Sequence, residues 1–509
     1  MTTQSHTFLW HDYETFGLDT RRDRPAQFAA IRTDADLNEI GEPIELYCQP
    51  HADYLPDPQS CLLTGITPQR CLERGLPEFE FARQIEAALS LEGTIGVGYN
   101  TIRFDDEVTR NLFWRNLIDP YSREWRNHCG RWDIQDLVRG VYALRPDGMV
   151  WPTAVNTKSD EQAEPRVSFK LELLSKANGI EHAAAHDAVS DVRATIALAR
   201  LIKEKQPKLF DFYLALHKKE RVMQELGLPV LPMDAKPFLH VSGMFPAERG
   251  CLAVMWPLAA HPTNKNEVIA WDLSAEGDSP SILRDLKADE IRQRMFSKQA
   301  DLPEGENGKL RRLPIKTVHL NKSPFVVGKL LSPALQAKWS INLEQCLERA
   351  RLAQALPEMS AVWSEVFTRP SRDKEVALDV DEALYDGFVG DADRRTLWKL
   401  QQLATAAPDK LGDRQPAFED PRLDEVLWRF RARNFPKTLN TEDQAAWAEH
   451  CRARLVDGAG HARTLTSYFE AIDKLQAALD KASEPNVAGK AVLISLRDYG
   501  EGLHQALSC

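Results

Sequence analysis

Two acidic residues near the start of the sequence have a spacing that suits catalysis. Asp12 and Glu14 lie two positions apart, directly after the apolar residues 8–10. Side chains at positions i and i+2 of a strand point to the same face. Carboxylates held this close repel each other unless cations lie between them, and Mg²⁺ or Mn²⁺ with oxygen ligands meets that need. The pair alone is weak evidence, because the same spacing recurs at Asp34/Asp36 and at Asp379/Asp381.

Two further segments contain acidic residues and a histidine that could form a metal site together with this pair. Asp105 opens a predicted helix after a strand-like segment and a turn, and Asp191 lies in the first turns of another predicted helix, with His186 just before it. Four carboxylates and one histidine are the groups that two-metal hydrolysis of a phosphodiester requires, with His186 able to take a proton from water. Asp106 is the alternative ligand, in which case Asp105 would cap its helix.

The order of these residues resembles that of a known class of nucleases. D-x-E at Asp12, F-D at Asp105 and H-x-x-x-x-D from His186 are similar to the histidine subclass of DEDD-type exonucleases, which have an RNase H-like fold. Longer segments resemble the bacterial exonuclease I family: Asp12–Gly17, Asp23–Phe28, Leu63–Pro68, Phe104–Arg110, Tyr142–Pro146, Lys176–Ile180, His240–Phe245 and Arg431–Pro436. The similarity spans nearly the whole chain and is densest before residue 205.

The resemblance implies a function and a set of roles. It implies a processive 3′→5′ exonuclease that degrades single-stranded DNA to 5′-mononucleotides, in DNA repair and recombination. It implies a monomer that uses two Mg²⁺ ions, for which Mn²⁺ may substitute. The implied metal ligands are Asp12, Glu14, Asp105 and Asp191, with His186 as general base.

The elements that must position these residues fall into three parts, an α/β (α+β) multidomain architecture. Residues 1–204 alternate strand-like segments (7–10, 26–32, 45–48 and 94–99) with helices (78–91, 105–117 and 188–203). After a helix at 211–226, residues to 354 hold short strand-like pieces (252–256, 268–273 and 315–320), and residues 355–509 are mostly helical. The resemblance identifies the parts as an RNase H-like exonuclease domain, an SH3-like β-rich domain and a C-terminal helical domain.

A basic segment stands out in a chain with a net charge of −11. Residues 309–342, the acid-free stretch, contain no Asp or Glu but include Lys316, Lys322 and five other cationic residues. It suits a groove that tracks single-stranded DNA or a dock for an acidic peptide. The family also binds the acidic C-terminal tail of single-stranded-DNA-binding protein, and we place Arg145 and this stretch at that dock. The alternatives are a solvated basic face and a structural salt bridge of Arg145.

Five residues outside the basic segment are candidates for contact with the DNA. Arg431, Arg433 and Phe435 combine charge with an aromatic face, which base stacking uses, although Phe435 is equally suited to core packing. We place Glu14 and Phe16 among the substrate-contacting residues, Phe16 because it lies close enough to the carboxylates to touch a terminal base.

The remaining composition limits the class of protein. The eight cysteines show no C-x-x-C pairing and no zinc-type spacing, which favours a reduced, intracellular protein. There is no secretion signal and no run of about 18 apolar residues. We therefore expect a cytoplasmic protein without a membrane span.

Two rival functions remain open. The same chemistry on RNA, or on a mispaired primer end, is usual in compact nuclease domains, whereas this chain has about 300 further residues. A DNA-binding scaffold with a dead site would be expected to lack at least one carboxylate or the histidine, and all five positions are filled.

Overall fold

The computed structural model describes residues 6–155, 164–181, 187–228, 235–305, 308–368, 378–413, 416–482 and 486–507. The chain divides into two compact units. The first unit comprises residues 1–130, 182–196 and 376–509, and the second comprises residues 131–181 and 197–375. Across the described ranges no helix has the length and apolar character needed to cross a membrane. The domain boundaries predicted after residues 204 and 354 stay predictions.

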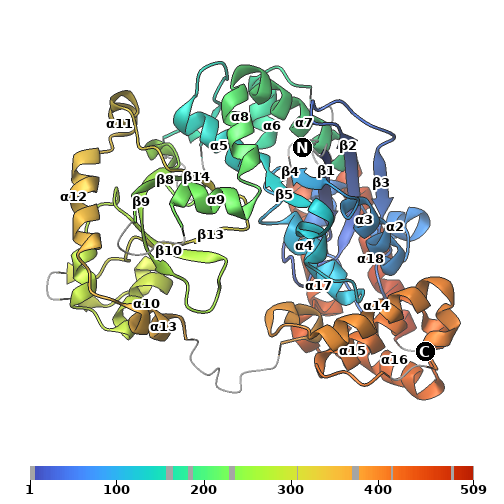
Figure 1. Cartoon of the computed structure of the whole chain (residues 1–509). Coiled ribbons are helices and arrows are strands. Elements are labelled where there is room, and N and C mark those ends of the chain that lie inside the picture. Colours follow the sequence, from blue (N-terminus) through green and yellow to red (C-terminus); the bar gives the residue numbers. More distant parts are fainter. Residues whose placement is uncertain are drawn as a thin grey trace. The chain divides into compact units, whose positions relative to one another are not determined.

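The first sheet has five strands, of which β1 to β4 lie in the first unit (Figure 1). The order is β3-β2-β1-β4-β5, with β1 at Thr7–Thr15, β2 at Pro25–Thr33, β3 at Ile44–Tyr47, β4 at Thr94–Gly98 and β5 at Gly130–Asp133. Strand β1 is antiparallel to β2 and parallel to β4. The predicted strand at 7–10 continues to Thr15, so that it carries both Asp12 and Glu14.

Helices pack the apolar face of this sheet. They include α3 (Glu78–Leu89) and α4 (Asp105–Arg115), while α1 (Pro58–Thr64) and α2 (Pro68–Arg74) lie between β3 and α3 in the chain. Tyr13, Phe28, Ile85 and Leu112 share one buried core. Because the neighbours of Tyr13 in β1 point to the opposite face, the strand that fills this core also presents Asp12 and Glu14 on its other side.

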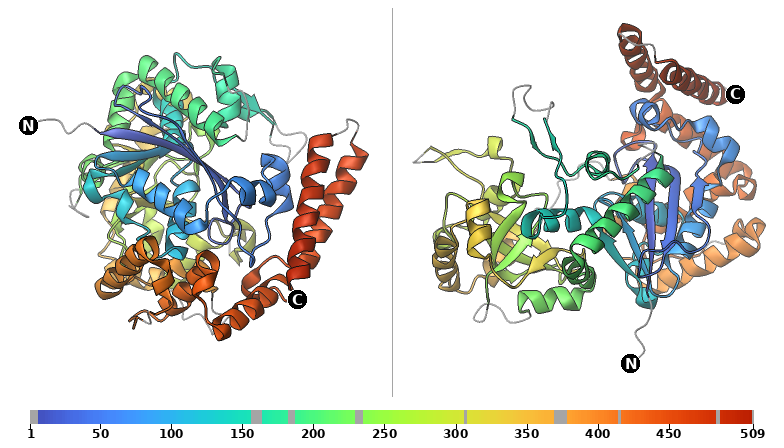
Figure 2. Two further views of the ribbon diagram at one scale, coloured as in Figure 1. Left: turned by 90° about the vertical axis from the view of Figure 1, so that its right-hand side faces the viewer. Right: turned by 90° about the horizontal axis from the view of Figure 1, so that it is seen from above.

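The last third of the chain completes the first unit. A short 3₁₀ helix, η6 (Val380–Tyr385), is followed by α14 (Asp391–Ala406), α15 (Arg422–Asn434), α16 (Thr441–Leu455), α17 (Leu465–Lys481) and α18 (Val487–Ala506). Figure 2 shows α17 and α18 side by side, and both contact α1. Their apolar residues, such as Tyr468 and Leu496, form one core with Phe16 and Tyr54 from the N-terminal part.

Buried ion pairs join the same two parts of the first unit. Arg433 contacts Asp53 at 2.7 Å and Asp381 at 2.6 Å, and Arg24 contacts Asp381 at 2.7 Å. Asp379 pairs with two further guanidinium groups, those of Arg429 at 2.6 Å and Arg454 at 2.7 Å. We call this set the arginine–aspartate cluster: Arg24, Asp53, Asp379, Asp381, Arg429, Arg433 and Arg454.

The second unit contains an antiparallel five-stranded sheet, as the β-rich character of the sequence predicts. Its order is β13-β10-β9-β8-β14, with β8 at Phe238–Val241, β9 at Leu252–Ala260, β10 at Glu267–Asp272, β13 at Ile315–His319 and β14 at Phe325–Val327.

The helix predicted at 211–226 is two helices, α8 (Pro207–Ala215) and α9 (Lys219–Leu226), because Lys218 has extended backbone angles. The remaining helices are α5 (Ile134–Leu144), α6 (Leu171–Ala177), α10 (Ala288–Phe296), α11 (Pro333–Trp339), α12 (Leu343–Gln354) and α13 (Ser360–Phe367). Helix α7 (Ala188–Lys205) begins in the first unit and ends in the second.

Candidate active site

Three carboxylates from two distant segments meet beside strand β1. Asp12 and Glu14 project from the same face of the strand, and Asp191 lies in the first turn of α7. One oxygen of each lies within 4.8 Å of the others. The i, i+2 spacing in the sequence thus produces the predicted juxtaposition, and Asp191 joins it.

Asp105 provides the fourth carboxylate. It is the first residue of α4, is 3% exposed, and its Oδ1 accepts a hydrogen bond of 3.1 Å from the backbone N–H of Tyr13. Tyr13 lies between Asp12 and Glu14, so this bond fixes Asp105 next to the pair. Asp106 instead forms a buried ion pair of 2.5 Å with Arg123. The geometry therefore favours Asp105 over Asp106 as the fourth member, and we call Asp12, Glu14, Asp105 and Asp191 the carboxylate site.

Burial and mutual repulsion keep these carboxyl groups away from their ordinary titration range. Burial, followed by the charge of Asp191, raises the pKa of Asp12 well above its usual value. Burial and the charge of Asp12 raise the pKa of Asp105 in the same way. Burial, Asp12, Asp191 and Asp187 raise the pKa of Glu14 to about 9. These carboxylates repel one another when they are charged, unless a cation binds between them.

The donor set fits divalent cations. Among the described residues, no Lys, Arg or His forms an ion pair with Asp12, Glu14 or Asp105. Carboxylate oxygens that are buried, close together and without a cationic side chain are the ligands that hard ions such as Mg²⁺ and Mn²⁺ prefer. The arrangement would hold such an ion between β1 and the first turn of α7.

The start of α7 contributes one residue that the sequence reasoning missed. Asp187 accepts a hydrogen bond of 3.0 Å from the N–H of Ser190 and so caps the helix that carries Asp191. Its charge also reaches Glu14, whose pKa it helps to raise. The pattern Asp187-x-x-Ser190 is a helix-start signal that the sequence contains. His186 lies outside the described residues, so its predicted role stays a prediction.

A hydrogen-bonded contact between β1 and α4 supports the site from behind. The Thr109 hydroxyl lies 3.0 Å from the Tyr13 hydroxyl and 2.8 Å from the Asp105 carbonyl oxygen. Tyr13 and Thr109 are both buried. The strand that carries Asp12 and the helix that begins at Asp105 are thereby tied together one turn behind the carboxylates.

Several predicted substrate contacts are corrected by their surroundings. Phe16 is 1% exposed and packs in the core with Tyr54, which leaves no face for a terminal base. Arg433 is buried in the arginine–aspartate cluster. Phe435 packs against Phe79 and Phe430, which is the core-packing alternative. Arg431 donates to the carbonyl oxygen of Thr438 at 2.6 Å, so it too is engaged within the protein.

The basic residues predicted in the second unit have different surroundings. Lys316 Nζ lies 2.9 Å from Nε2 of His240 and 2.8 Å from Oγ of Ser242, so it supports the sheet and is not free for a strand of DNA. Lys322 is half-buried between β13 and β14. Arg145 is exposed, and it forms no ion pair with any described residue, which removes the salt-bridge alternative within the described chain.

Arg145 also lines a cavity of about 720 Å³ in the second unit. Lys208 and Lys329 are the other cationic residues of its wall, and Lys329 belongs to the acid-free stretch. The apolar part of the wall consists of Leu144, Pro207, Leu209, Phe212, Leu239, Val327, Leu330, Leu331 and Leu335. No carboxylate is among the lining residues, so the cavity combines an apolar wall with positive charge.

Comparison with known proteins places these features in a family. Residues 9–199 match the family model described as exonuclease, residues 217–369 the exonuclease I SH3-like domain, and residues 378–503 the exonuclease I C-terminal domain. Exodeoxyribonuclease I of Escherichia coli K12 is 43% identical over 450 residues, which are 88% of this chain and 90% of that protein.

Solved structures agree over almost the full length. A moderately thermophilic exonuclease I from Methylocaldum szegediense has a TM-score of 0.86 and 44% identity, covering 98% of this chain and 99% of that one. A zinc-bound complex of E. coli exonuclease I with single-stranded DNA has a TM-score of 0.85 and 40% identity, covering 98% and 100%.

The mixed sheet with a carboxylate site at β1, together with the first family model, defines a nuclease of the exonuclease class. The chain belongs to the exodeoxyribonuclease I family. The predicted fold class, with an exonuclease domain, an SH3-like domain and a C-terminal helical domain, is confirmed.

Proposed function

We propose that this protein is a processive 3′→5′ exonuclease that degrades single-stranded DNA to 5′-mononucleotides by two-metal hydrolysis. The observation that carries the proposal is the clustering of Asp12, Glu14 and Asp191, whose carboxylate oxygens lie within 4.8 Å of one another. The E. coli relative bound to single-stranded DNA supports the choice of substrate.

The metal requirement follows from the donor set. Asp12, Glu14, Asp105 and Asp191 would hold two Mg²⁺ ions, with Mn²⁺ able to replace them. Such ions polarise the scissile phosphate, lower the pKa of water and neutralise the charge of the departing 3′-oxygen. The protein's own contribution is to hold four anionic ligands in place, which the Tyr13 N–H and the Asp187 cap do for Asp105 and α7.

His186 completes the proposed chemistry. Its position five residues before Asp191 puts it next to the helix that carries a ligand. A histidine titrates near neutral pH, so its neutral form can accept a proton from the attacking water at physiological pH. We propose that Glu14 also contacts the terminal nucleotide.

Substitution of the ligands tests the site. Asp12→Ala and Asp191→Ala should abolish release of mononucleotides from a 3′-labelled single strand in Mg²⁺, while a filter-binding assay shows binding largely retained. Asp36→Ala is the matched control, because Asp36 is exposed and belongs to a pair with the same spacing. Full activity in either ligand variant would falsify the assignment.

Matched oligomers separate the rival substrates. We expect a DNA 20-mer to be degraded faster than an RNA 20-mer of the same sequence, and faster than a mispaired primer end in a duplex. RNA cleavage at an equal or greater rate would favour an oligoribonuclease-like function. Binding without any hydrolysis would favour a scaffold with a dead site.

We also propose that the Arg145 cavity binds the acidic C-terminal tail of single-stranded-DNA-binding protein. The supporting observation is the combination of Arg145, Lys208 and Lys329 with an apolar wall, since an acidic peptide with apolar residues is complementary to both. Arg145→Glu or Lys329→Glu should weaken binding of a fluorescent tail peptide at least tenfold. Lys338→Glu, in the acid-free stretch but outside the cavity, is the control. Equal affinity in all three variants would contradict this dock.

The cellular setting that we propose follows from the family. The protein would act as a monomer in the cytoplasm, removing single-stranded DNA during repair and recombination. Gel filtration with light scattering tests the monomer, and sensitivity of a deletion strain to DNA damage tests the role.

A further inference from the structure

A second cavity, of about 320 Å³, lies in the first unit at the far end of helix α4 from Asp105. One wall consists of the end of α4 and the turn that follows it, including Trp114, Leu117 and Ile118. The other wall comes from the C-terminal part of the chain, including Leu384, Phe388 and α14. Ten helical residues at about 1.5 Å each place it roughly 15 Å from the start of α4, so it is separate from the carboxylate site. We call it the Arg394 pocket.

Large apolar side chains at this pocket are exposed to solvent. Phe388 is 91% exposed and Trp398 is 60% exposed, while Trp114 and Leu397 line the interior and are buried. Leaving two aromatic rings of this size in water is unfavourable, and exposed apolar groups around a depression are typical of a surface that another molecule covers.

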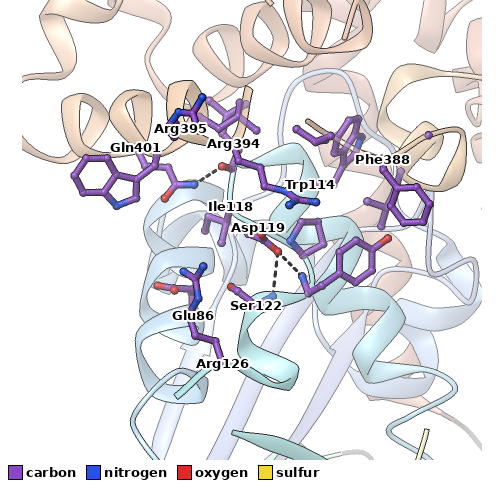
Figure 3. A pocket seen from close by; sticks show the side chains of 18 residues that line it. Glu86, Trp114, Ile118, Asp119, Ser122, Arg126, Phe388, Arg394, Arg395 and Gln401 are labelled. Carbon is purple, nitrogen blue, oxygen red and sulfur yellow. Dashed lines mark hydrogen bonds between the residues drawn. The ribbon is translucent and has the colours of Figure 1, made fainter. Parts of the chain in front are cut away.

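Three arginines surround the apolar interior. Figure 3 shows Arg394 and Arg395 on α14 on one side and Arg126 on the opposite side. No described carboxylate forms an ion pair with Arg126 or Arg395, and Arg394 pairs only with the exposed Asp391, at 3.1 Å. An exposed pair of this kind contributes little, so all three guanidinium groups remain available to an incoming anion.

The two acidic residues of the lining do not cancel this charge. Asp119 accepts hydrogen bonds from the N–H groups of Tyr121 at 2.9 Å and Ser122 at 3.0 Å, as the dashed lines in Figure 3 show. Glu86 accepts from the Ser90 hydroxyl, and burial raises its pKa. Even with both carboxylates charged, the three arginines leave the lining with a net charge of +1. The pocket therefore presents positive charge around an apolar interior.

The polar groups of the lining distinguish between possible occupants. Gln401 donates to the carbonyl oxygen of Leu117, and Oδ1 of Asp119 accepts from the N–H groups of its own turn, so the backbone of the protein already holds both side chains. The interior that remains is aliphatic and aromatic, which suits a large apolar side chain. Tryptophan and arginine are also the residues that dominate the binding energy of protein interfaces.

We propose that the Arg394 pocket docks an acidic segment of a partner protein, with one aromatic or aliphatic side chain inserted between α4 and α14. The arginines would pair with Asp or Glu residues on either side of the inserted side chain. The site is independent of the nuclease reaction and of the Arg145 cavity, so it gives the enzyme a second point of recruitment.

The direct test uses a fluorescein-labelled 12-residue peptide with one Trp flanked by Asp and Glu, and the full-length protein in EDTA. The background variant is Arg145→Glu, which removes binding at the other cavity. Anisotropy at low salt should show saturable binding. Replacing the peptide's Trp by Ser, or its acidic residues by Lys, should weaken binding at least tenfold.

Variants of the protein locate the peptide. Charge reversal of both Arg394→Glu and Arg395→Glu should weaken binding at least tenfold, and Trp398→Ala should do so without changing charge. Lys399→Glu is the matched control, since Lys399 is an exposed cation of the same helix outside the pocket. Hydrolysis of a dT12 oligonucleotide by each variant should keep the rate of the Arg145→Glu background, which also shows that each variant is folded.

Two outcomes would overturn the proposal. One is peptide binding that is absent, or equal in the wild type, the double variant and Trp398→Ala. The other is a tenfold loss of dT12 binding in the double variant with peptide affinity unchanged, which would assign the pocket to nucleic acid.

Discussion

At the scale of single residues, the carboxylate site is a place where function opposes stability. Asp12, Glu14 and Asp191 bring negative charge together in a partly buried space, and the raised pKa of Asp12 and of Glu14 reflects how unfavourable that is without a cation. Active sites commonly hold such groups, which are stabilised by the ligand that they bind rather than by their neighbours in the chain.

Replacement of one ligand by its amide should reveal both effects. In EDTA, Asp12→Asn should raise the thermal unfolding midpoint by roughly 1 °C, because the entropy of unfolding of a chain of 509 residues is about 1 kcal/mol/K and the expected gain is about 1 kcal/mol. In Mg²⁺ the same variant should lose activity by about 10²–10³-fold or more, as expected when a group that holds transition-state charge is lost. Scanning calorimetry measures the unfolding midpoint and single-turnover hydrolysis measures the activity, with Asp36→Asn as control. A lower midpoint in EDTA would show that the carboxylates stabilise the fold.

At the scale of secondary structure, the contact of β1 with α4 sets the spacing of the ligands. Tyr13 reaches α4 twice, through its N–H to Asp105 and through its hydroxyl to Thr109. Only the second contact uses a side chain that can be altered without removing a ligand. Under the proposed function Tyr13 is a positioning residue, because it would act on the reaction through the placement of Asp105.

Loss of this contact should affect the reaction and not DNA binding. We expect Tyr13→Phe and Thr109→Val each to lower kcat about tenfold, because small displacements of catalytic groups reduce rates strongly, with KM for a dT oligomer unchanged. Thr109→Ser keeps the hydroxyl and should restore most of kcat. If Thr109→Ser were as slow as Thr109→Val, the methyl group and not the hydrogen bond would be responsible.

The sequence predicted the position of most of these strands and helices and the face on which their side chains lie. Strand β1, helix α4 and helix α7 follow from apolar periodicity, and the i, i+2 spacing placed Asp12 and Glu14 on one face. Strand β5 and helix α5 were missed, because Gly130–Asp133 is short and its helix begins at the next residue. Asp105 could be separated from Asp106 only once Arg123 was seen to occupy the latter.

Long-range contacts explain the predictions that were wrong. Arg433 meets Asp53 across 380 positions of sequence, and a run of Arg and Phe gives no local sign of such partners. Phe16 follows the ligands directly in the chain, yet it packs with residues of α17 and α18 from the other end. Composition can indicate base stacking, but burial decides whether a side chain is available for it.

At the scale of the whole molecule, the arginine–aspartate cluster holds the C-terminal part against the N-terminal part of the first unit. Its charges are buried, and each carboxylate contacts more than one guanidinium group. A buried pair of this type contributes modest net stability when intact, whereas removing one partner leaves an uncompensated charge.

Removal of the central guanidinium should be strongly destabilising. Arg433→Met should lower the free energy of unfolding by about 3–5 kcal/mol, because Asp53 and Asp381 lose their shared partner. Urea unfolding followed by circular dichroism measures this loss. Arg452→Met, which removes an exposed pair on α16, should leave the free energy of unfolding essentially unchanged. The proposed DNA contact of Arg433 would instead predict weaker DNA binding at unchanged stability.

The same cluster predicts loss of stability in acid. Burial alone would raise the pKa of Asp53 and of Asp381, but Arg433 and the other cationic side chains of the cluster together outweigh burial and hold the pKa of each well below its usual value. The folded protein therefore binds protons less readily at these groups than the unfolded chain does, so their contribution is complete above about pH 4 and is lost as the pH falls further. Thermal midpoints between pH 6 and pH 3 should fall most steeply below about 4, and less steeply in Arg433→Met.

The residues of the first unit are not synthesised together, because the unit consists of segments from both ends of the chain. Its sheet and all described members of the carboxylate site are present once a ribosome has added Asp191, but the partners of Arg24 and Asp53 arrive only with residues 379–454. The whole of residues 197–375 must emerge in between. A growing chain thus contains the four carboxylates of the site long before it contains the residues that pair with Arg24 and Asp53 in the finished first unit.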